Sequence, residues 1–247
     1  MNIAYKLVRT ADKILNFVIY FCLIVVFIFC LYALFDTIKI YFNASSNNVS
    51  VLKPSVEDPQ ESLKSLKAIN EDICGWITID DTNIDYPIVR GANNQEYLSK
   101  DVYKNYSLSG SIFLDYRNSM DFSDKKSVIF GHHMSGGAMF GDIQNFADSE
   151  YFSSHTTGYL YTEDGVYTLR IYAFLATDAY DSYIYSMIDN QTDENQEKIL
   201  EYIKEHASRY RDVGVTIDDR IICLSTCSTA TTNGRYVLVA KIEENEN

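Results

Sequence analysis

Residues 220–227, RIICLSTC, form an apolar stretch that ends in a cysteine. β-branched and other apolar residues dominate it, as is typical of a buried strand. A polar loop, STATTNG, follows at 228–234, and Arg235 then opens a second apolar run that extends to 242. The stretch therefore predicts two β-strands, at 220–226 and 235–242. The first ends beside a cysteine, and the second begins with an arginine.

Six earlier segments have the same character. They are short, rich in β-branched and aromatic residues, and bounded by Gly, Asp or Asn, which favours strands. The segments are 74–80, 84–89, 111–115, 127–131, 158–162 and 166–176. Between the last two, Glu163, Asp164 and Gly165 form a hairpin turn signal. Eight strands with few helices predict a closed or nearly closed β-barrel.

Helical inserts interrupt the strands, so the expected fold is mainly β with helical inserts. The expected helical segments are 57–70, 94–98, 140–146 and 193–209. In the first and the last of them, apolar residues recur at helical spacing and share one face. Those residues are Leu63, Leu66 and Ile69 in the first, and Ile199, Leu200, Ile203 and Ala207 in the last.

An apolar segment near the N-terminus predicts a membrane span. Residues 14–35 contain no charged side chain, and as a helix they would extend about 33 Å, enough for a hydrocarbon core of about 30 Å. Lys6, Arg9 and Lys13 precede the segment, and Asp36 follows it. By the positive-inside rule, the N-terminus is expected in the cytoplasm and the remainder of the chain outside.

A cleaved signal peptide is the alternative interpretation of this segment. Signal peptides have apolar regions of about 7 to 15 residues that end in a small-x-small cleavage site. The run here is longer, and CLYALFD at 30–36 offers no such site, which favours an uncleaved anchor in the cell membrane. The expected organisation is a cytoplasmic N-terminus at 1–13, a transmembrane anchor at 14–35, a juxtamembrane stalk with a helix at 36–70, and an exported barrel at 71–247.

The charge balance excludes one class of function. The chain carries 21 Lys and Arg against 34 Asp and Glu, a net charge of −13. Nucleic-acid binding needs a basic face that neutralises phosphates, so we expect no nucleic-acid partner. A strongly acidic exported domain is expected to be soluble.

The five cysteines predict a free thiol outside the membrane. Cys22 and Cys30 lie in the apolar segment, which leaves an odd set of Cys74, Cys223 and Cys227. Four residues of strand separate Cys223 from Cys227 by about 13 Å, whereas a disulfide needs Cα atoms about 4.4–6.8 Å apart. Cys74 could pair with either but is expected to be a packing residue. The spacing does not favour a zinc site, so no metal is expected.

A second stretch supplies a partner for the thiol. VIFGHHM at 128–134 is an apolar strand that ends in a glycine and two histidines. A thiolate at Cys227 could attack a carbonyl carbon, and the imidazole of His132 could move protons as acid and base. The guanidinium of Arg235 could stabilise an oxyanion. Each residue alone has a common structural explanation as a turn, a packing residue or an ion pair, but together they make an acyl-transfer site without metal or cofactor.

The order and spacing of these residues resemble the sortase family, and class B sortases in particular. The family's cysteine motif corresponds to LSTC at 224–227, its histidine follows a glycine at a strand end as His132 does, and its arginine opens the last strand as Arg235 does. The stretch SGSIFLDYRN at 109–118 and the helical insert at about 178–212 also resemble class B members. The resemblance covers nearly all of the exported domain and implies an eight-stranded sortase-type β-barrel.

The resemblance further implies a cysteine transpeptidase, of the cysteine-peptidase class of hydrolases, on the outer face of a Gram-positive membrane. Cys227 would attack the Thr carbonyl of a C-terminal sorting motif in a secreted protein and form a thioester. An amine, usually of the peptidoglycan cross-link, would then resolve it. His132 would act as acid and base, Arg235 would stabilise substrate and oxyanion, and no cofactor is implied.

The sequence leaves open which further residues contact the substrate and which of three functions the barrel has. His133 is adjacent to His132, and successive strand residues face opposite ways, so only one of them would face Cys227. Ser225, Thr226 and His133 are further candidates for substrate contacts. An exported Cys/His peptidase that releases the acyl group to water is one alternative function. A membrane-tethered binding barrel with an inert Cys227 is another.

Overall fold

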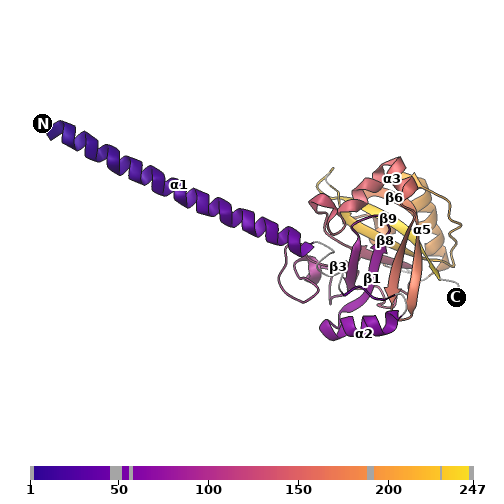
Figure 1. The fold of residues 1–247 in the computed structure, drawn as a ribbon. Helices are drawn as coiled ribbons and strands as arrows, with labels where there is room; N and C mark the ends of the chain where they lie inside the picture. Colours follow the sequence, from indigo (N-terminus) through magenta and orange to yellow (C-terminus); the bar gives the residue numbers. More distant parts are fainter. Residues whose placement is uncertain (1–2, 45–51, 56–57, 188–191, 229, 245–247) are drawn as a thin grey trace. The chain divides into compact units, whose positions relative to one another are not determined.

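The computed structural model describes residues 3–44, 52–55, 58–187, 192–228 and 230–244 (Figure 1). The chain divides into two compact units, Met1–Phe42 and Asn43–Asn247. Residues 45–51 and 56–57 of the expected stalk lie outside the described residues, as do 188–191 of the expected helical insert and Thr229 of the loop after Cys227.

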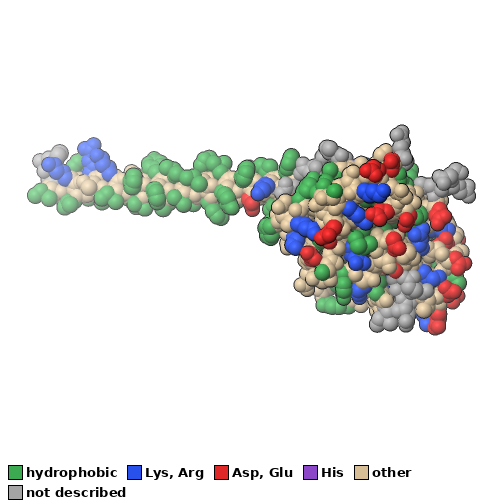
Figure 2. Space-filling model, turned by 90° about the horizontal axis from the view of Figure 1, so that it is seen from below, with side chains coloured by type: hydrophobic (Ala, Val, Ile, Leu, Met, Phe, Trp, Pro, Cys, Tyr) green, Lys and Arg blue, Asp and Glu red, His purple; other side chains and the backbone are tan. Residues whose placement is uncertain are grey.

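The first unit consists of the long helix α1 (Ile3–Ala44) as far as Phe42. The span Tyr5–Phe42 is long and apolar enough to cross a membrane. Its most apolar part has a mean hydropathy of 3.0 and is 0% buried. Figure 2 shows hydrophobic side chains along the visible face of this helix, with Lys and Arg near its beginning. The helix is compatible with a membrane anchor. It continues past residue 35, where a stalk was expected, because 36–44 contain no Gly or Pro to end it.

The second unit is built on an eight-stranded, mixed β-barrel, as the sequence predicts. The strands are β1 (Ile73–Ile79), β2 (Asp85–Val89), β3 (Ile112–Leu114), β4 (Lys126–Phe130), β5 (Thr157–Thr162), β6 (Gly165–Asp178), β8 (Arg220–Cys227) and β9 (Gly234–Glu244). They follow the order β5-β1-β2-β3-β4-β8-β9-β6, and β6 pairs back with β5 to close the barrel. Most neighbours are antiparallel, but β2–β3 and β4–β8 are parallel. The two-residue strand β7 (Arg209–Tyr210) extends the sheet beside β6.

Three apolar clusters hold this unit together. One contains residues from all eight barrel strands and fills the interior. A second packs the helix α2 (Pro59–Ile69) on the outer face of β1, through Leu63 and Leu66. A third covers the outer faces of β4, β6, β8 and β9 with α4 (Ser182–Tyr185) and α5 (Asp193–His206). Each fully buried Leu or Ile contributes about 1.5–3 kcal/mol.

The helices begin and end where capping residues allow. Asp58 caps α2 by accepting a bond from the backbone of Glu61, and Thr192 caps α5 in the same way. The expected helix at 193–209 ends early, at His206, because the backbone of Ser208 donates to Phe174 of β6 and the chain turns into β7. The remaining short elements are η3 (Glu96–Leu98), η4 (Ser135–Gly137), η5 (Gly141–Ala147) and α3 (Ser149–Ser154).

Candidate active site

Three neighbouring strands bring Cys227, His132 and Arg235 together. β4 and β8 run parallel, and Phe130 pairs with Ser225. Continued by two residues, the same register aligns His132 with Cys227. β8 and β9 are antiparallel, and Cys227 lies directly opposite Arg235. Directly opposed residues point to the same face of a sheet.

Strand alternation places this group on the outer face of the barrel. Cys223 packs in the outer cluster with α5, so Ser225 and Cys227, two and four residues further on, share its face. Val237 belongs to the same cluster, and Arg235 precedes it by two residues. The site therefore continues the surface that α4 and α5 cover, just beyond the edge of that covering.

The end of β4 is fixed to β8 at Gly131. The backbone N–H of Gly131 donates to the carbonyl of Ser225 at 3.1 Å, and the hydroxyl of Thr226 donates to the carbonyl of Gly131 at 2.8 Å. A Cβ at Gly131 would lie 2.4 Å from Ile112 and 2.7 Å from the ring of Phe140, so only glycine fits. Close packing against Ile112 and Phe140 thus explains why a glycine precedes His132 in the sequence.

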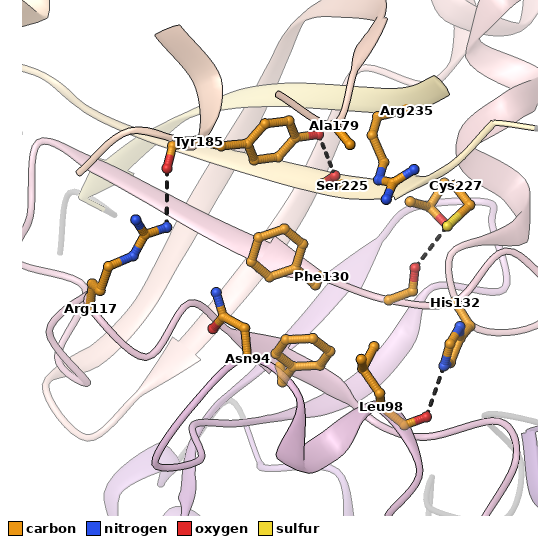
Figure 3. Close-up of a pocket in the computed structure, with 13 residues that line it drawn as sticks. Asn94, Leu98, Arg117, Phe130, His132, Ala179, Tyr185, Ser225, Cys227 and Arg235 are labelled. Atoms are coloured by element: carbon orange, nitrogen blue, oxygen red, sulfur yellow. Dashed lines mark hydrogen bonds between the residues drawn. The ribbon is translucent and has the colours of Figure 1, made fainter. Parts of the chain in front are cut away.

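A pocket of about 330 Å³ contains the three residues (Figure 3). Ser225 and Thr226 also line it, as do Asn94, Leu98, Phe113, Arg117, Phe130 and Tyr185. The sequence predicted none of these last six as site residues. Phe113 and Arg117 lie in the stretch 109–118 that resembles class B sortases, and this resemblance could have indicated them.

Cys227 is the accessible thiol of the barrel unit. All five cysteines are free, and Cys227 is exposed, whereas Cys74 and Cys223 are buried. Burial raises the pKa of both Cys74 and Cys223 to about 12, which keeps these two thiols protonated. The expectations that Cys74 packs in the core and that a free thiol lies outside the apolar segment are confirmed.

The four histidines have different surroundings. His132 lines the pocket, and its Nε2 lies 2.9 Å from the backbone carbonyl of Leu98. His133 does not line the pocket, and its Nε2 is buried without a hydrogen-bond partner among the described residues. His155 and His206 stack on Tyr151 and Tyr202, away from the pocket.

Arg235 lies beside Cys227 in the pocket, as Figure 3 shows. Its Nη1 donates to the carbonyl of Gly234 at 2.9 Å, which fixes part of the guanidinium. The group is permanently cationic and has further N–H donors. Within the described ranges, no group of three or more His, Cys, Asp or Glu side chains could hold a metal ion.

The wall opposite His132 is aromatic and partly polar. The hydroxyls of Tyr185 and Ser225 are 2.8 Å apart, and the ring of Tyr185 stacks on Phe130 with centroids at 6.1 Å. Burial raises the pKa of Tyr185, so its hydroxyl stays protonated at neutral pH. Tyr185 ends α4, so this short helix sets one side of the pocket.

Arg117 connects that wall to the barrel. Its Nη2 donates to the backbone carbonyl of Tyr185 at 3.0 Å and to the carboxylate of Asp115 at 2.6 Å. Asn94 donates to the same carboxylate at 2.8 Å. Burial alone would raise the pKa of Asp115, but the bonds from Arg117 and Asn94 hold it below its ordinary value.

The comparison with known proteins agrees with this geometry. A family model described as the sortase domain matches residues 77–243. The chain belongs to the sortase family. Among curated sortases, sortase B of Listeria monocytogenes is 37% identical over 187 residues, which cover 74% of this chain and 74% of that protein.

Solved sortase structures place the chain with class B. A mutant form of Clostridium perfringens sortase B matches with a TM-score of 0.74 and 34% identity, covering 80% of this chain and 96% of the other. A Streptococcus pyogenes class B sortase involved in pilus biogenesis matches with a TM-score of 0.67 and 42% identity, covering 73% and 97%. Membership of this family supports the role of a cysteine transpeptidase.

Proposed function

We propose that this sortase is a membrane-anchored transpeptidase that cleaves a C-terminal sorting motif of secreted proteins after Thr and transfers the acyl group to a cell-wall amine. The observation that carries the proposal is the exposed thiol of Cys227, directly opposite Arg235 and level with His132 in one pocket. A nucleophile, an acid–base group and a fixed cation are the parts that acyl transfer needs.

In the first half-reaction, the thiol proton of Cys227 passes to His132, and the sulfur attacks the Thr carbonyl carbon of the motif. The C–N bond of the scissile peptide breaks, and a thioester forms on Cys227. His132 gives a proton to the departing amine, which leaves with the cargo's tail. The guanidinium of Arg235 donates hydrogen bonds to the oxygen that becomes negatively charged.

In the second half-reaction, an amine attacks the thioester carbonyl. A new amide bond forms, the C–S bond breaks, and His132 takes the proton that the amine loses. The proposed acceptor is an amine of the peptidoglycan cross-link. Water in place of the amine would make the protein a peptidase, and a pilin amine would make it a pilus polymerase, which the Streptococcus pyogenes relative brings into consideration.

The anchor and the location belong to the same proposal. The apolar helix α1 would span the cytoplasmic membrane once, with the basic residues before it in the cytoplasm. The barrel would then lie outside the cell, where both the secreted cargo and the wall amine are present.

The test uses the full chain in detergent micelles. It is mixed with peptides of the LPxTG, PPxTG and NPxTN kinds, with and without an amine acceptor, and the products are identified by mass spectrometry. We expect cleavage after Thr, an acyl adduct on Cys227 and an amine-dependent ligated product. Cys227→Ala should lose all three, and Cys74→Ala, which removes a thiol outside the pocket, is the matched control.

The outcomes separate the alternatives. Cleavage without ligation to any amine favours the peptidase. The absence of reaction and adduct, with Cys227 also resisting alkylation in the folded chain, favours the binding barrel. Full cleavage and transfer by Cys227→Ala would contradict the proposed mechanism altogether.

A further inference from the structure

The imidazole of His132 makes one hydrogen bond that determines where its proton lies. Its Nε2 is 2.9 Å from the backbone carbonyl oxygen of Leu98. A carbonyl oxygen only accepts hydrogen bonds, so Nε2 must be the donor. In the neutral ring, Nδ1 then carries the free lone pair. In Figure 3 the imidazole lies between the Leu98 carbonyl and the side of the pocket that holds Cys227 and Arg235.

We propose that the backbone carbonyl of Leu98 is the positioning group for His132: it fixes the Nε2–H tautomer, so that Nδ1 is the atom that gives and takes protons. The inference rests on the proposed role of His132 as acid and base. In many acyl-transfer enzymes, the base is oriented by a third group that accepts a bond from its other nitrogen. Here a main-chain oxygen would take that part.

No acidic side chain of the described chain competes for this role. Among the described residues that line the pocket there is neither Asp nor Glu. The carboxylate of Asp115 is fully buried and engaged with Arg117 and Asn94. A main-chain carbonyl orients the ring without bringing a full negative charge near the thiol.

The carbonyl of Leu98 is held from one side by Tyr97. Tyr97 is 1% exposed, and its hydroxyl donates to the carboxylate of Asp72 at 2.6 Å and accepts from the amide of Asn70 at 2.9 Å. Its own carbonyl accepts from the backbone of Ser111 at 3.0 Å. The short helix η3, which ends at Leu98, is thereby fixed to the residues before β1.

On another side, the backbone of Gly110 lies close to this carbonyl. Gly110 has a φ of +60°, and a Cβ there would lie 2.6 Å from the carbonyl oxygen of Tyr97 and 2.7 Å from that of Leu98. No real Cβ approaches an oxygen so closely, so a side chain must displace these carbonyls. A substitution at Gly110, which does not itself line the pocket, can thus alter the bond between Leu98 and His132.

The experiment measures the tautomer directly. The full chain is labelled with ¹⁵N-histidine in detergent micelles, and His132 is assigned by the loss of its signals in His132→Gln. Long-range ¹H–¹⁵N correlation spectra, recorded where the ring is neutral, distinguish Nε2–H from Nδ1–H. We expect His132 to be in the Nε2–H form, and the Nδ1–H form in the native chain would overturn the inference.

Two glycine variants test whether the carbonyl causes this preference. Gly110→Ala should leave a mixture of tautomers and lower kcat about 10- to 100-fold, with KM nearly unchanged. The loss should not exceed the lower limit of general acid–base effects, about 10²-fold, because part of the ring population keeps the native tautomer. Gly214→Ala is the matched control, because Gly214 has a similar φ of +66° but nothing within 4 Å of its Cβ position. If both variants keep the native tautomer and the same kcat, the carbonyl does not position the ring.

A third variant covers the case in which Gly110→Ala does not fold. Tyr97→Phe removes the hydroxyl bonds to Asp72 and Asn70 but keeps the ring, and it should shift the tautomer in the same direction by a smaller amount. The spectra need no substrate. A native Nε2–H tautomer in a chain that turns over no peptide would therefore reject the proposed function and retain the inference about Leu98.

Discussion

Access to solvent distinguishes the three thiols of the barrel unit. Cys227 is exposed, while Cys74 and Cys223 are buried and have pKa values raised to about 12. Because the thiolate is the reactive form, iodoacetamide should modify Cys227 in the folded chain and the other two only in denaturant. Peptide mass mapping at intervals gives the three rates. Alkylation of Cys223 as fast as Cys227 in the folded chain would contradict the burial.

The charge and the shape of Arg235 can be separated by substitution. Arg235→Ala removes both, and we expect kcat/KM to fall by about 10²–10³-fold, as for the loss of an oxyanion donor. Arg235→Lys keeps the charge but loses the planar fork of donors, so it should recover only part of the activity. Kinetics on the best peptide measure both effects. Arg170→Lys, at a half-exposed pair with Glu243 outside the pocket, should have no effect, and an equal loss there would mean that the effect of Arg235→Lys is not specific to the pocket.

At the scale of elements, α4 is a one-turn helix whose carbonyls are held by two cations. Arg117 donates to the carbonyl of Tyr185, and Lys126 donates to those of Tyr183 at 2.7 Å and Ser186 at 3.0 Å. Lys126 lies on β4 and is 0% exposed. Strand β4 thus leads to His132, two residues beyond its end, and its first residue, Lys126, supports the aromatic wall.

Removal of the buried ammonium should loosen that wall. Lys126→Met leaves two carbonyls without this donor, which we expect to cost about 1–3 kcal/mol of unfolding free energy. Peptide KM should rise as well, because Tyr183 and Ser186, which lie on either side of the pocket residue Tyr185 in the chain, lose their bonds to Lys126. Urea denaturation and kinetics measure the two effects. Lys198→Met, at an exposed pair with Glu194 on α5, should change stability by no more than about 0.5 kcal/mol.

The carboxylate of Asp115 makes part of the stability depend on pH. Burial opposes its ionisation, but bonds from Arg117 and Asn94 lower its pKa below the ordinary value. The stabilisation is therefore present at neutral pH. It is lost as the pH falls from about 4, the ordinary pKa of an aspartate, to below the lowered pKa of Asp115.

We therefore expect Asp115→Asn to lower the free energy of unfolding by about 1.5–3 kcal/mol at neutral pH. The difference in this free energy between variant and native chain should become smaller in acid. Urea denaturation across this pH range measures it. Asp218→Asn, at an exposed position, should follow the native curve. A constant difference at all pH values would mean that the loss has a steric cause.

At the scale of the whole molecule, the apolar helix and the barrel are separate units, Met1–Phe42 and Asn43–Asn247. Deletion of residues 1–42 should move the protein from the membrane fraction to the soluble fraction, because no other described helix is long and apolar enough to span a bilayer. Turnover of a free peptide should change by less than about twofold, since a domain with its own core folds alone. Fractionation and kinetics test both parts. Retention in the membrane after deletion would require a second attachment.

Strand positions could be predicted from the sequence because their signals are local. Short runs rich in β-branched and aromatic residues predicted all eight barrel strands, and Gly131 before His132 predicted a strand end. The choice of Cys227, His132 and Arg235 also needed the order and spacing of the sortase family, because each residue alone is a weak signal. β7 escaped detection, because two residues carry no periodicity and the strand exists only where Arg209 and Tyr210 meet β6. The early end of α5 also depends on a contact between segments distant in sequence, because the backbone bond from Ser208 to β6 outweighs helix propensity.

The sequence by itself determined the order of the chain segments, the acidic composition and the apolar helix, because each depends on a residue's identity or its near neighbours. It also offered Cys227, His132 and Arg235 as candidates, through their order and spacing in the pattern of the sortase family. Only the tertiary structure decided the alignment of Cys227 with Arg235, the aromatic wall at Tyr185 and the bond from His132 to Leu98. These contacts join residues about 8 to 40 positions apart in the chain, and they depend on how strands and loops pack together, which no single segment specifies.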